Sequence, residues 1–506
     1  MQLSELIKNM EIEAVVGPTG PAISALCCDS RQVVPGALFF ALPGSRLDGV
    51  HYVPEALAKG AAAIVAQQRP EQWSGDGTLI LVKNVRRSMA LAANHYYRQP
   101  SAGIPVVGVT GTNGKTTITY LLEAIMQQGG YTPAVFGTVD YRIGATRFSS
   151  SHTTPESVDL LRMLAEFRAQ GADALILEVS SHALEQHRAD GLDFDVAVFT
   201  NLTPEHLDYH GDLEGYFSSK RRLFSDLLGS GRAVVNRDDQ FGRRLLKEFP
   251  NSCSFGRETA EVCVKQVRLG RDGIKGSFNT PAGEVAIDSG LIGTFNVSNL
   301  LAAVAAASCL NIAPDRIAAG IAAAPQIPGR VERVDNALGI LALVDYAHTP
   351  DALEQVLKTL KQLEAGKLIT LAGCGGDRDP SKRPVMAAAA VRYSELAILT
   401  SDNPRSEDPL AILEQMRRGA LQAGAVEFSP ADVERHCAKG FVVIPDRREA
   451  IRFAVSRAVA GDLLLVAGKG HEDYQILGRQ RIHFDDREEL RIAMQAAAQH
   501  NGEVPA

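Results

Sequence analysis

The sequence has few of the features that mark several classes of protein. Its seven cysteines form no C-x-x-C pair, and Cys27 and Cys28 are adjacent. This spacing is typical of neither a zinc site nor a disulfide framework, so we expect a reducing compartment. Positive charge is not in excess, because 52 Lys and Arg residues face 59 Asp and Glu residues, for a net charge of −7. That balance argues against a general nucleic-acid-binding protein, which needs basic faces.

Long apolar segments are also missing. The Ala- and Leu-rich stretch around residues 300–307 is far shorter than the ~20 residues that a membrane-spanning helix needs. The first residues, MQLSELIKNMEIEAVVG, lack the basic start and apolar core of a signal peptide. We therefore expect a cytoplasmic protein with no membrane span. We expect a monomer whose partners are small molecules and not nucleic acid.

What the sequence does contain is an alternation of short apolar strands with helix-length segments. A chain of 506 residues predicts roughly three domains. Strands separated by helices predict mainly parallel sheets with both faces covered, so the expected class is α/β, with a Rossmann-like carboxyl-terminal domain. The stretches YRQPSAGIP and APQIPGRVERV look like linkers. The predicted domains are residues 1–99, 100–328 and 329–506.

The strongest single motif is VVGVTGTNGKTTITYLL, residues 106–122. An apolar strand runs into a Gly-rich turn and then into a helix that starts near Lys115, which is typical of a phosphate-binding loop. Lys115 would reach the β- and γ-phosphates, and the Thr116 hydroxyl would coordinate Mg²⁺. The spacing departs from the usual pattern, which has glycine where Val109 stands. The predicted nucleotide-binding residues of this loop are Gly111, Thr112, Asn113, Gly114, Lys115, Thr116 and Thr117.

Polar residues also gather at the ends of other predicted strands. Glu178 ends the strand in ALILEVSSH and could hold Mg²⁺, directly or through water. The segment TNLTPEHLDYHG contributes His206, Asp208 and His210. This H-x-D-x-H spacing fits a transition-metal site weakly, and a polar loop with local hydrogen bonds is the preferred interpretation for Asp208 and His210.

Eight segments occur in an order that is typical of one family. They are GVTGTNGKTT, EVSSHALEQHR, TNLTPEHLDYHG with a following lysine, GTFNVSNLLAA, GRVERV, VDYAHTPDAL, GCGGDRD and AGKGHEDY. On these segments the chain resembles the Mur ligase family over essentially its whole length. The resemblance implies an amino-terminal uridine-nucleotide-binding domain, a central P-loop-type ATPase domain and a carboxyl-terminal domain for the incoming amino acid.

The resemblance also implies a reaction, the making of an amide bond. A substrate carboxylate takes the γ-phosphoryl group of ATP to give an acyl phosphate and ADP, an amine attacks, and phosphate leaves. Such phosphoryl transfer depends on positioning and charge neutralisation. The implied substrates are ATP with Mg²⁺, UDP-MurNAc-L-Ala-D-Glu and meso-2,6-diaminopimelate, and the product would be a peptidoglycan precursor for cell-wall growth and division.

The family's ATP-site residues carry over to matching positions of this chain. Lys220 falls where the family has a carbamylated lysine, although the residues alone favour a surface lysine in a basic run. The implied catalytic residues are Lys115, Glu178, His206 and carbamylated Lys220. The implied metal ligands are Thr116, Glu178, His206 and Lys220. Further nucleotide contacts are Asn296, Asn299, Arg330, Asp345 and His348. The asparagines could instead cap the Ala-rich helix.

The resemblance also places the UDP-MurNAc-dipeptide, whose pyrophosphate and carboxylates suit hydroxyl, amide and guanidinium groups. The implied contacts are Cys28, Ser30, Ser45, Arg46, Leu47, His152, Thr153, Thr154, Ser180, Gln186 and Arg188. Relatives vary in the amino-terminal loop. Without the family, the DSR segment at residues 29–31 would be interpreted as a capped turn.

The segment TSDNPRSEDP, residues 400–409, would select the amino acid. Diaminopimelate has a far carboxylate that lysine lacks, and the Arg405 guanidinium can bind a carboxylate through two N–H groups. Asp402 would attract an ammonium group. The implied diaminopimelate-binding residues are Arg378, Asp402, Asn403, Pro404, Arg405, Gly468 and Glu472. The same segment could simply start a helix, and both roles are compatible.

Four other functions fit part of these motifs. Two of them share the family's chemistry: a lysine-adding ligase and a folylpolyglutamate synthetase. The synthetase would lack the amino-terminal uridine-nucleotide region and the DNPR motif at residues 402–405. From other classes they are a P-loop ATPase switch and a zinc hydrolase built on His206, Asp208 and His210.

Overall fold

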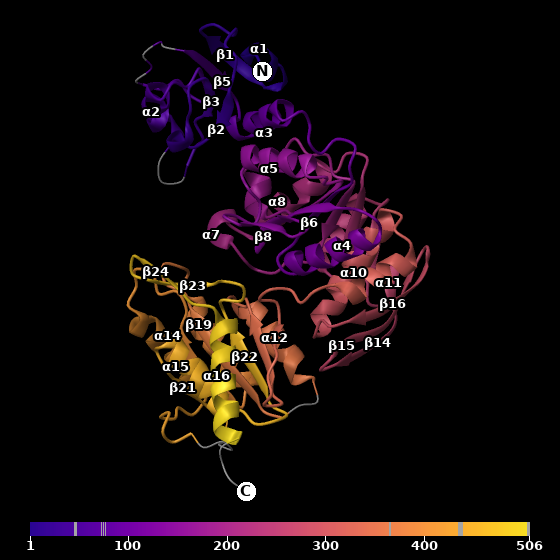
Figure 1. Ribbon diagram of the computed structural model, residues 1–506, viewed down its shortest axis with the longest axis vertical. Helices are drawn as coiled ribbons and strands as arrows, with labels where there is room; N and C mark the ends of the chain where they lie inside the picture. The colour runs from indigo at the N-terminus through magenta and orange to yellow at the C-terminus, as the bar shows by residue number, and fades with distance from the viewer. Residues whose placement is uncertain are drawn as a thin grey trace. The chain divides into compact units, whose positions relative to one another are not determined.

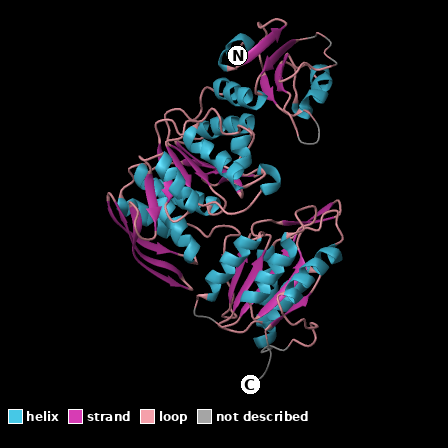
Figure 2. Cartoon of the chain, turned by 180° about the vertical axis from the view of Figure 1, so that it is seen from behind, coloured by secondary structure: helices cyan, strands magenta, loops and turns pink. Residues whose placement is uncertain are grey.

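The computed structural model of the chain describes residues 1–44, 48–71, 73, 75, 77–363, 366–433 and 439–502. Within these residues, three large sheets follow one another along the chain, and helices flank each of them (Figure 1). Figure 2 shows the same alternation, with helices against the strands of each sheet. The predicted α/β class is confirmed. Every helix in this described part is too short or too polar to span a membrane.

The amino-terminal sheet has the strand order β1-β5-β4-β3-β2, and β1 is antiparallel to β5. Its elements are α1 (Leu3–Leu6), β1 (Ile12–Val16), β2 (Ala25–Cys27), β3 (Ala37–Phe40), α2 (Val53–Ala58), β4 (Ala63–Ala66), β5 (Thr78–Val82) and α3 (Val85–Tyr96). Successive residues of β3 enter different cores. Leu38 and Phe40 pack in the core that contains Met89 of α3, whereas Phe39 packs in the core that contains Val53 of α2. Both faces of the sheet are therefore covered.

The central sheet has the order β16-β15-β14-β13-β12-β11-β6-β10-β7-β8-β9. Its elements are β6 (Val106–Thr110), α4 (Lys115–Gln128), β7 (Pro133–Phe136), β8 (Asp140–Ile143), β9 (Thr146–Ser149), α5 (Ser157–Ala169), β10 (Ala174–Glu178), α6 (Ser181–Glu185), β11 (Val196–Phe199), α7 (Leu207–His210), α8 (Leu213–Ser225), β12 (Arg232–Asn236), α9 (Gln240–Glu248), β13 (Cys253–Gly256), β14 (Val262–Gly270), β15 (Gly273–Thr280), β16 (Gly283–Ser289), α10 (Thr294–Cys309) and α11 (Pro314–Ala323). β6 lies between β10 and β11, is parallel to both, and is buried throughout. The loops after these three strands therefore leave from one edge of the sheet.

The carboxyl-terminal sheet has the order β17-β18-β22-β19-β20-β21, in which β17 is antiparallel to β18 and the remaining neighbours are parallel. Its elements are β17 (Glu332–Val334), β18 (Leu341–Asp345), α12 (Pro350–Lys361), β19 (Leu368–Cys374), α13 (Lys382–Tyr393), β20 (Leu396–Ser401), α14 (Pro409–Gln422), β21 (Gly440–Val443), α15 (Arg447–Arg457), β22 (Leu463–Ala467) and α16 (Asp486–Gly502). This is the Rossmann-like arrangement that the sequence predicted. A separate antiparallel hairpin, β23 (Tyr474–Leu477) and β24 (Gln480–His483), was not predicted.

Candidate functional site

The predicted phosphate loop is fastened to the segment that follows β11. The backbone N–H groups of Thr112 and Asn113 donate to the carbonyl and side-chain oxygens of Asn201, each at 2.9 Å. The Thr200 hydroxyl donates to the Asn113 carbonyl at 2.6 Å. A Cβ atom at Gly111 would lie 1.9 Å from the Thr200 hydroxyl oxygen, so this approach requires glycine. No prediction from the sequence included Thr200 or Asn201.

The predicted turn into a helix is confirmed. α4 begins at Lys115, and Gly114 precedes it in the left-handed conformation at φ 93°. The Lys115 ammonium group folds back onto the loop and donates to the carbonyls of Gly111 and Thr112 at 2.9 and 2.8 Å. Backbone N–H groups at a helix start, with an ammonium group beside them, form an anion site of the kind that binds phosphate.

Glu178 is buried at the end of β10 and faces the start of α4. Its carboxylate accepts hydrogen bonds from the hydroxyls of Thr116 and Thr138, at 3.1 and 2.9 Å, and from the Thr138 amide at 3.0 Å. A Cβ atom at Gly137 would lie 2.3 Å from this carboxylate, so glycine makes room for it. The predicted neighbours Thr116 and Glu178 are thus in contact. Thr138 was missed, because it follows β7 and no local motif marks it.

Lys220 lies on the inner face of α8 with 1% of its surface exposed. Its nitrogen donates to the Gly111 carbonyl at 2.9 Å and lies 4.5 Å from the centre of the Tyr216 ring. Burial lowers the pKa of Lys220 well below its ordinary value, and the nearby Lys115 charge acts in the same direction. The alternative of a surface lysine is therefore wrong.

The H-x-D-x-H segment forms a cluster of rings around His182, which the sequence did not single out. The His182 ring lies 4.8 Å from that of His206, 5.3 Å from that of His210 and 4.3 Å from that of Tyr209. Burial, with the neighbouring His206 next, lowers the pKa of His182 to about 4. Burial also lowers the pKa of His206.

His210 makes the local hydrogen bonds that were expected of it. Its ring nitrogens lie 3.0 Å from the Ser181 hydroxyl and 3.3 Å from the Ser219 hydroxyl. Asp208 is exposed on α7. Among the described residues, no group of three His, Cys, Asp or Glu side chains could hold a metal ion. The geometry therefore gives the zinc-hydrolase alternative no support.

Predicted substrate contacts of the central region lie next to Glu178. The Thr154 hydroxyl donates to the Glu178 carbonyl at 2.7 Å, and the Ser180 hydroxyl caps α6 by accepting from the Ala183 amide at 3.1 Å. Arg188 donates to the Thr154 carbonyl at 3.0 Å and to the Gln186 side-chain oxygen at 2.8 Å. These residues converge on one edge of the sheet, beside the phosphate loop.

Two further contacts on this side are Thr153 and His152. The Thr153 hydroxyl lies 3.1 Å from that of Thr138. The His152 carbonyl accepts from the Tyr141 hydroxyl at 2.6 Å, and burial lowers the pKa of the His152 ring. Thr153 is therefore connected through Thr138 to Glu178, the predicted Mg²⁺ ligand. His152 is connected to Tyr141 of β8.

In the amino-terminal region the DSR segment is a capped turn, as the alternative interpretation had it. Asp29 caps a short helical turn, Ser30–Gln32, by accepting from the Arg31 amide. The Ser30 hydroxyl donates to Glu55 at 2.9 Å. Burial raises the pKa of the Cys28 thiol to about 12. The predicted contacts Ser45, Arg46 and Leu47 lie outside the described residues.

The predicted nucleotide contacts of the second half form two small groups. Asn299 donates to Asn296 at 2.8 Å, and Asn296 donates to the Ile292 carbonyl at 2.8 Å, so these side chains do not make the helix cap that was considered. At the end of β18, buried Asp345 accepts from the amides of Val331 and Ala347, each at 2.7 Å. Burial raises the pKa of Asp345.

Arg330 and His348 are both beside Tyr346, the residue after β18. The Arg330 guanidinium lies 4.7 Å from the centre of the Tyr346 ring, and His348 Nδ1 lies 2.8 Å from the Tyr346 carbonyl. Arg330 also lines a cavity of about 180 Å³ with residues 289–292 and 324–327.

The 402–405 loop is held by the β23 strand of the hairpin. The Asn403 side-chain oxygen accepts from the Ile476 amide at 2.9 Å, and Gln475 donates to the Asp402 carbonyl at 2.7 Å. Arg405 has φ 54°, and its amide donates to the Ile476 carbonyl at 3.1 Å. Pro404 is buried between them. The start of the following helix is also confirmed, since Asp408 caps α14.

The Arg405 guanidinium is only partly used by the protein. In the described part of the chain its hydrogen bonds all leave from Nη1, to the carbonyls of Gly376 at 2.8 Å and Asn403 at 3.5 Å. The other N–H groups of this fork can face a ligand. Arg378 follows Gly376 by two residues and is exposed, and its guanidinium donates to the Asp377 carbonyl at 2.9 Å.

A buried cation, Lys469, lies beside the 402–405 loop, and no prediction from the sequence included it. Its nitrogen lies 3.2 Å from Glu472 and 3.7 Å from Asp402. Asn403 donates to the same Glu472 carboxylate at 2.9 Å. Burial and then the Asp402 charge raise the pKa of Glu472. Gly468, at φ 118°, lets the backbone turn here.

The candidate residues fall into two compact units of the chain. The first unit contains the phosphate loop, Glu178, His206, Lys220 and the predicted substrate contacts from Cys28 to Arg188. Asn296, Asn299 and the groups around Asp345 and Arg405 belong to the second. Within the first unit, Thr116, Thr154, Ser180 and Arg188 lie in one network around Glu178, and Lys115 and Lys220 share the Gly111 carbonyl; within the second, Asp402, Asn403 and Glu472 lie around Lys469.

The sequence matches three protein-family descriptions in succession. Residues 22–108 match "Mur ligase family, catalytic domain", residues 109–307 match "Mur ligase middle domain", and residues 329–470 match "Mur ligase, glutamate ligase domain". The predicted domain limits 1–99, 100–328 and 329–506 stay predictions.

Similar proteins extend over the full length. The chain is 48% identical over 502 residues to the UDP-N-acetylmuramoyl-L-alanyl-D-glutamate–2,6-diaminopimelate ligase of Geobacter metallireducens, covering 97% of this chain and 98% of that protein. It is 45% identical to the ligase of the same name from Geobacillus kaustophilus, covering 98% and 99%. A solved structure of such a ligase, 34% identical, superposes with a TM-score of 0.70 over 98% of this chain and 99% of that one.

A fourth protein shares the fold at lower identity. The folylpolyglutamate synthase of Mycobacterium tuberculosis, solved with ADP and AMPPCP, is 20% identical, with a TM-score of 0.59 over 76% of this chain and 92% of that one.

Proposed function

This chain belongs to the Mur ligase family, and we propose that within it the protein joins meso-2,6-diaminopimelate to UDP-N-acetylmuramoyl-L-alanyl-D-glutamate using ATP. It would be an acid–amino-acid ligase of peptidoglycan precursor synthesis, which releases ADP and phosphate. The observation that carries the proposal is the buried Lys220 nitrogen, 2.9 Å from the Gly111 carbonyl of the phosphate loop. A P-loop switch would not need a buried lysine amine beside its phosphate loop.

The donor atoms around the loop fit Mg²⁺. The Thr116 hydroxyl and the Glu178 carboxylate lie 3.1 Å apart and are hard oxygen donors, which Mg²⁺ prefers. Mg²⁺, when bound, would neutralise charge on the transferred phosphoryl group. Thr138 would orient Glu178, because it donates to both carboxylate oxygens. His206 is the predicted nitrogen ligand.

Lys220 fits carbamylation. Burial lowers the pKa of Lys220 and so favours its neutral amine, which is the form that can attack CO₂. The new N–C bond gives a carbamate and releases one proton, so a neutral amine becomes an anionic oxygen donor. Carbamylated Lys220 would then hold a metal ion beside the phosphates, together with Glu178.

The chain's own residues would orient both reactants. Arg188, Thr154 and Ser180 suit the pyrophosphate and carboxylate of the nucleotide-bound dipeptide, because they offer charged and hydroxyl donors. Lys115 and the amides of the phosphate loop would hold the β- and γ-phosphates of ATP. The dipeptide carboxylate would then attack the γ-phosphorus, and the resulting acyl phosphate would accept the amine.

Arg405 would select the amino acid. Its guanidinium can pair with the far carboxylate of diaminopimelate through two N–H groups, which the point charge of a lysine side chain cannot reproduce. With lysine as substrate, the guanidinium would lose this partner and face an ammonium group. Asp402 and Glu472 would favour the ammonium groups of the substrate.

The test is ATP turnover with UDP-MurNAc-L-Ala-D-Glu, comparing diaminopimelate with lysine. We expect phosphate release that requires the nucleotide and diaminopimelate together and that is far slower with lysine. Release that ignores both would exclude a ligase, and equal rates with lysine would identify the lysine-adding alternative. The folylpolyglutamate alternative predicts turnover with a folate substrate instead. Cytoplasmic location and a monomeric state are expectations from the sequence.

A further inference from the structure

The carboxyl end of α6 departs from the usual chemistry of helix ends. The Arg188 amide donates to the Ala183 carbonyl at 2.8 Å, and the His187 amide donates to the Leu184 carbonyl at 3.2 Å. This pair of bonds is a Schellman motif, whose left-handed position is usually glycine. Here it is His187, at φ 55°. A side chain in this conformation adds strain, so its presence points to a role for the imidazole ring.

The ring of His187 is held from both sides. Its Nε2 lies 2.9 Å from Asn84 Nδ2, and its Nδ1 lies 2.8 Å from Asp190 Oδ2. The orientation of Asn84 is fixed, because its oxygen caps α3 by accepting from the Arg87 amide at 3.0 Å. The Asn84 NH₂ group therefore donates to Nε2. With Nε2 accepting, a neutral ring carries its proton on Nδ1, which faces Asp190 Oδ2 at 2.8 Å and, at the longer distance of 3.2 Å, Arg222 Nη2.

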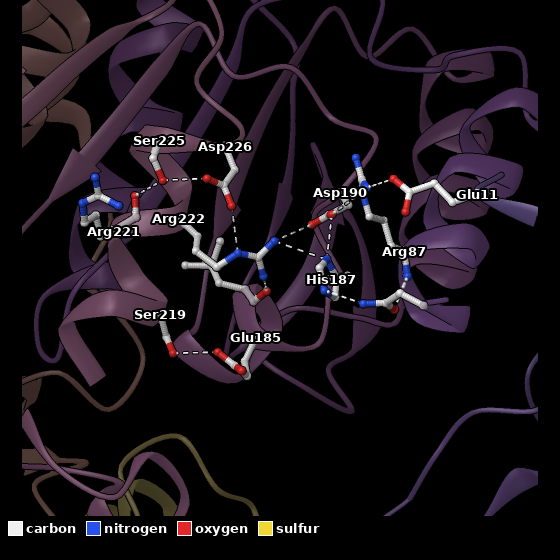
Figure 3. Close-up of polar contacts among 12 residues, drawn as sticks. Glu11, Arg87, Glu185, His187, Asp190, Ser219, Arg221, Arg222, Ser225 and Asp226 are labelled. Carbon is white, nitrogen blue, oxygen red and sulfur yellow. Dashed lines mark hydrogen bonds and ion pairs between the residues drawn. The ribbon is translucent and has the colours of Figure 1, made fainter. Parts of the chain in front are cut away.

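Asp190 connects this ring to two helices. Its side chain is 8% exposed and lies 3.9 Å from Arg87 of α3 and 3.8 Å from Arg222 of α8. Arg222 continues to Asp226 at 2.9 Å, and Arg87 also pairs with Glu11 (Figure 3). In Figure 3 the Asp190 carboxylate faces both the His187 ring and the Arg222 guanidinium. The turn after α6 is thus tied to α3 of the amino-terminal region and to α8, which carries Lys220.

The residues on either side of His187 are Gln186 and Arg188, the proposed contacts of the UDP-muramoyl dipeptide. Arg188 donates to the Gln186 side chain at 2.8 Å and pairs with Glu156 at 3.0 Å. Glu156 in turn lies 3.2 Å from Arg86 of α3. Both sides of the turn are therefore anchored on the same helix of the amino-terminal region.

We propose that His187 is a positioning residue, whose ring, held between Asn84 and Asp190, sets the orientation of Gln186 and Arg188 toward the UDP-muramoyl dipeptide. This inference rests on the proposed function. It makes the docking of α3 a condition for correct substrate contacts in the central region.

The first test is His187→Gly. Glycine adopts the left-handed position without strain, so it keeps the turn and removes only the ring. We expect a Tm close to that of wild type, because the relief of backbone strain offsets the lost hydrogen bonds. We expect KM for UDP-MurNAc-L-Ala-D-Glu to rise about 3- to 10-fold while KM for ATP stays the same, as for the loss of one or two hydrogen bonds. Equal KM values for the nucleotide in variant and wild type would overturn the positioning role.

A second test reverses the polarity of the Asn84 contact. Asn84→Asp keeps the cap of α3 but puts a carboxylate oxygen in place of the amide NH₂ group that faces Nε2. We expect KM for the nucleotide to rise, because two acceptor atoms then face each other. Asn84→Ser keeps a cap and removes the contact without adding a charge, so we expect a smaller rise. Equal KM values for the nucleotide in Asn84→Asp and Asn84→Ser would contradict the inferred tautomer.

The control is Arg221→Gln, next to Arg222 on α8. Arg221 pairs at 2.6 Å with Glu248 at the surface, so we expect kinetic constants like those of wild type. Calorimetric titration with UDP-MurNAc-L-Ala-D-Glu separates the two proposals. No binding to the wild-type chain would overturn the proposed function, whereas equal binding by wild type and His187→Gly would overturn the positioning role alone.

Discussion

The Lys220 nitrogen lies 2.9 Å from the Gly111 carbonyl oxygen, although the two residues are 109 positions apart in the sequence. The contact joins α8 to the loop after β6. It buries an amine where a nucleotide's phosphates would lie, and burial removes the water that would stabilise the charged form. Burial therefore favours the uncharged amine of Lys220, which is more reactive toward CO₂ than the charged amine of a surface lysine.

The first prediction concerns carbamylation of Lys220. With ¹³C-labelled bicarbonate, wild-type protein should give a carbamate carbon resonance, and Lys220→Arg should not. Because only the neutral amine reacts, the signal should fall as the pH drops through the lowered pKa of Lys220. A spectrum without the resonance in wild-type protein at alkaline pH would rule out the modification.

The second prediction is chemical rescue at the same position. Lys220→Ala should lower kcat by on the order of 10²-fold, because one anionic ligand near the phosphates is lost. Acetate or propionate should restore part of this rate, since a small carboxylate can occupy the space left. Chloride at equal ionic strength is the control. Equal effects of chloride and acetate would contradict the role of the carbamate.

The third prediction concerns amino-acid selection. Arg405→Ala and Arg405→Lys should each lower kcat/KM for diaminopimelate by at least roughly 100-fold, because neither side chain gives a two-pronged bond to the far carboxylate. Rates with lysine should not fall in parallel. Arg418→Ala, an exposed arginine that pairs with Glu414 at 2.9 Å, is the control. Unchanged kinetics in both Arg405 variants would remove this residue from the pocket.

The fourth prediction tests the packing of the phosphate loop. Gly111→Ala would place a methyl group 1.9 Å from the Thr200 hydroxyl oxygen, so the loop must shift. We expect a loss of about 1–3 kcal/mol in the free energy of unfolding and an increase in Kd for ADP of at least ~10-fold. Gly20→Ala, where no atom lies within 4 Å of the added carbon, is the control. Wild-type affinity in Gly111→Ala would show that the loop can relax.

The fifth prediction concerns the pH dependence of stability. The pKa of Glu472 is raised above 4.5 by burial and by Asp402, so the folded state holds the proton more tightly than the unfolded state. This contribution is present at low pH and is lost as the pH rises through the raised pKa. In urea unfolding, Glu472→Gln should therefore become more stable relative to wild type as the pH rises from about 4.5. If the difference in the free energy of unfolding between Glu472→Gln and wild type stayed the same at every pH, the raised pKa of Glu472 would be contradicted.

Much of the fold was predictable because its signals are local. The apolar strand, the Gly-rich turn and the helix from Lys115 follow one another in the chain, and each leaves a pattern in a short window. The β23–β24 hairpin was missed, because its four-residue strands are partly exposed and lack a clear alternation.

The site was only partly predictable, for a related reason. Glu178 was found because it ends a predicted strand, and Lys220 through a family motif. Thr138 lies outside the family segments, and Asn201 and Lys469 lie inside two of them without a role that the sequence alone would assign. They matter because strands distant in sequence end at the same sheet edge, and that neighbourhood exists only in the folded chain. The burial of Lys220 has the same origin, since the residues around it in sequence are basic and polar.

The loop at residues 402–405, which we propose selects the amino acid, is held by the β23 strand, and this would limit how the preference can be transferred between relatives. Asn403 is bonded to Ile476, 73 positions further along, and the Arg405 carbonyl accepts from the Gly478 amide at 2.8 Å. A graft of the loop alone would place foreign side chains on an unmatched support. An exchange that moves the loop together with residues 469–478 would carry the geometry with it, so these two segments form one structural unit.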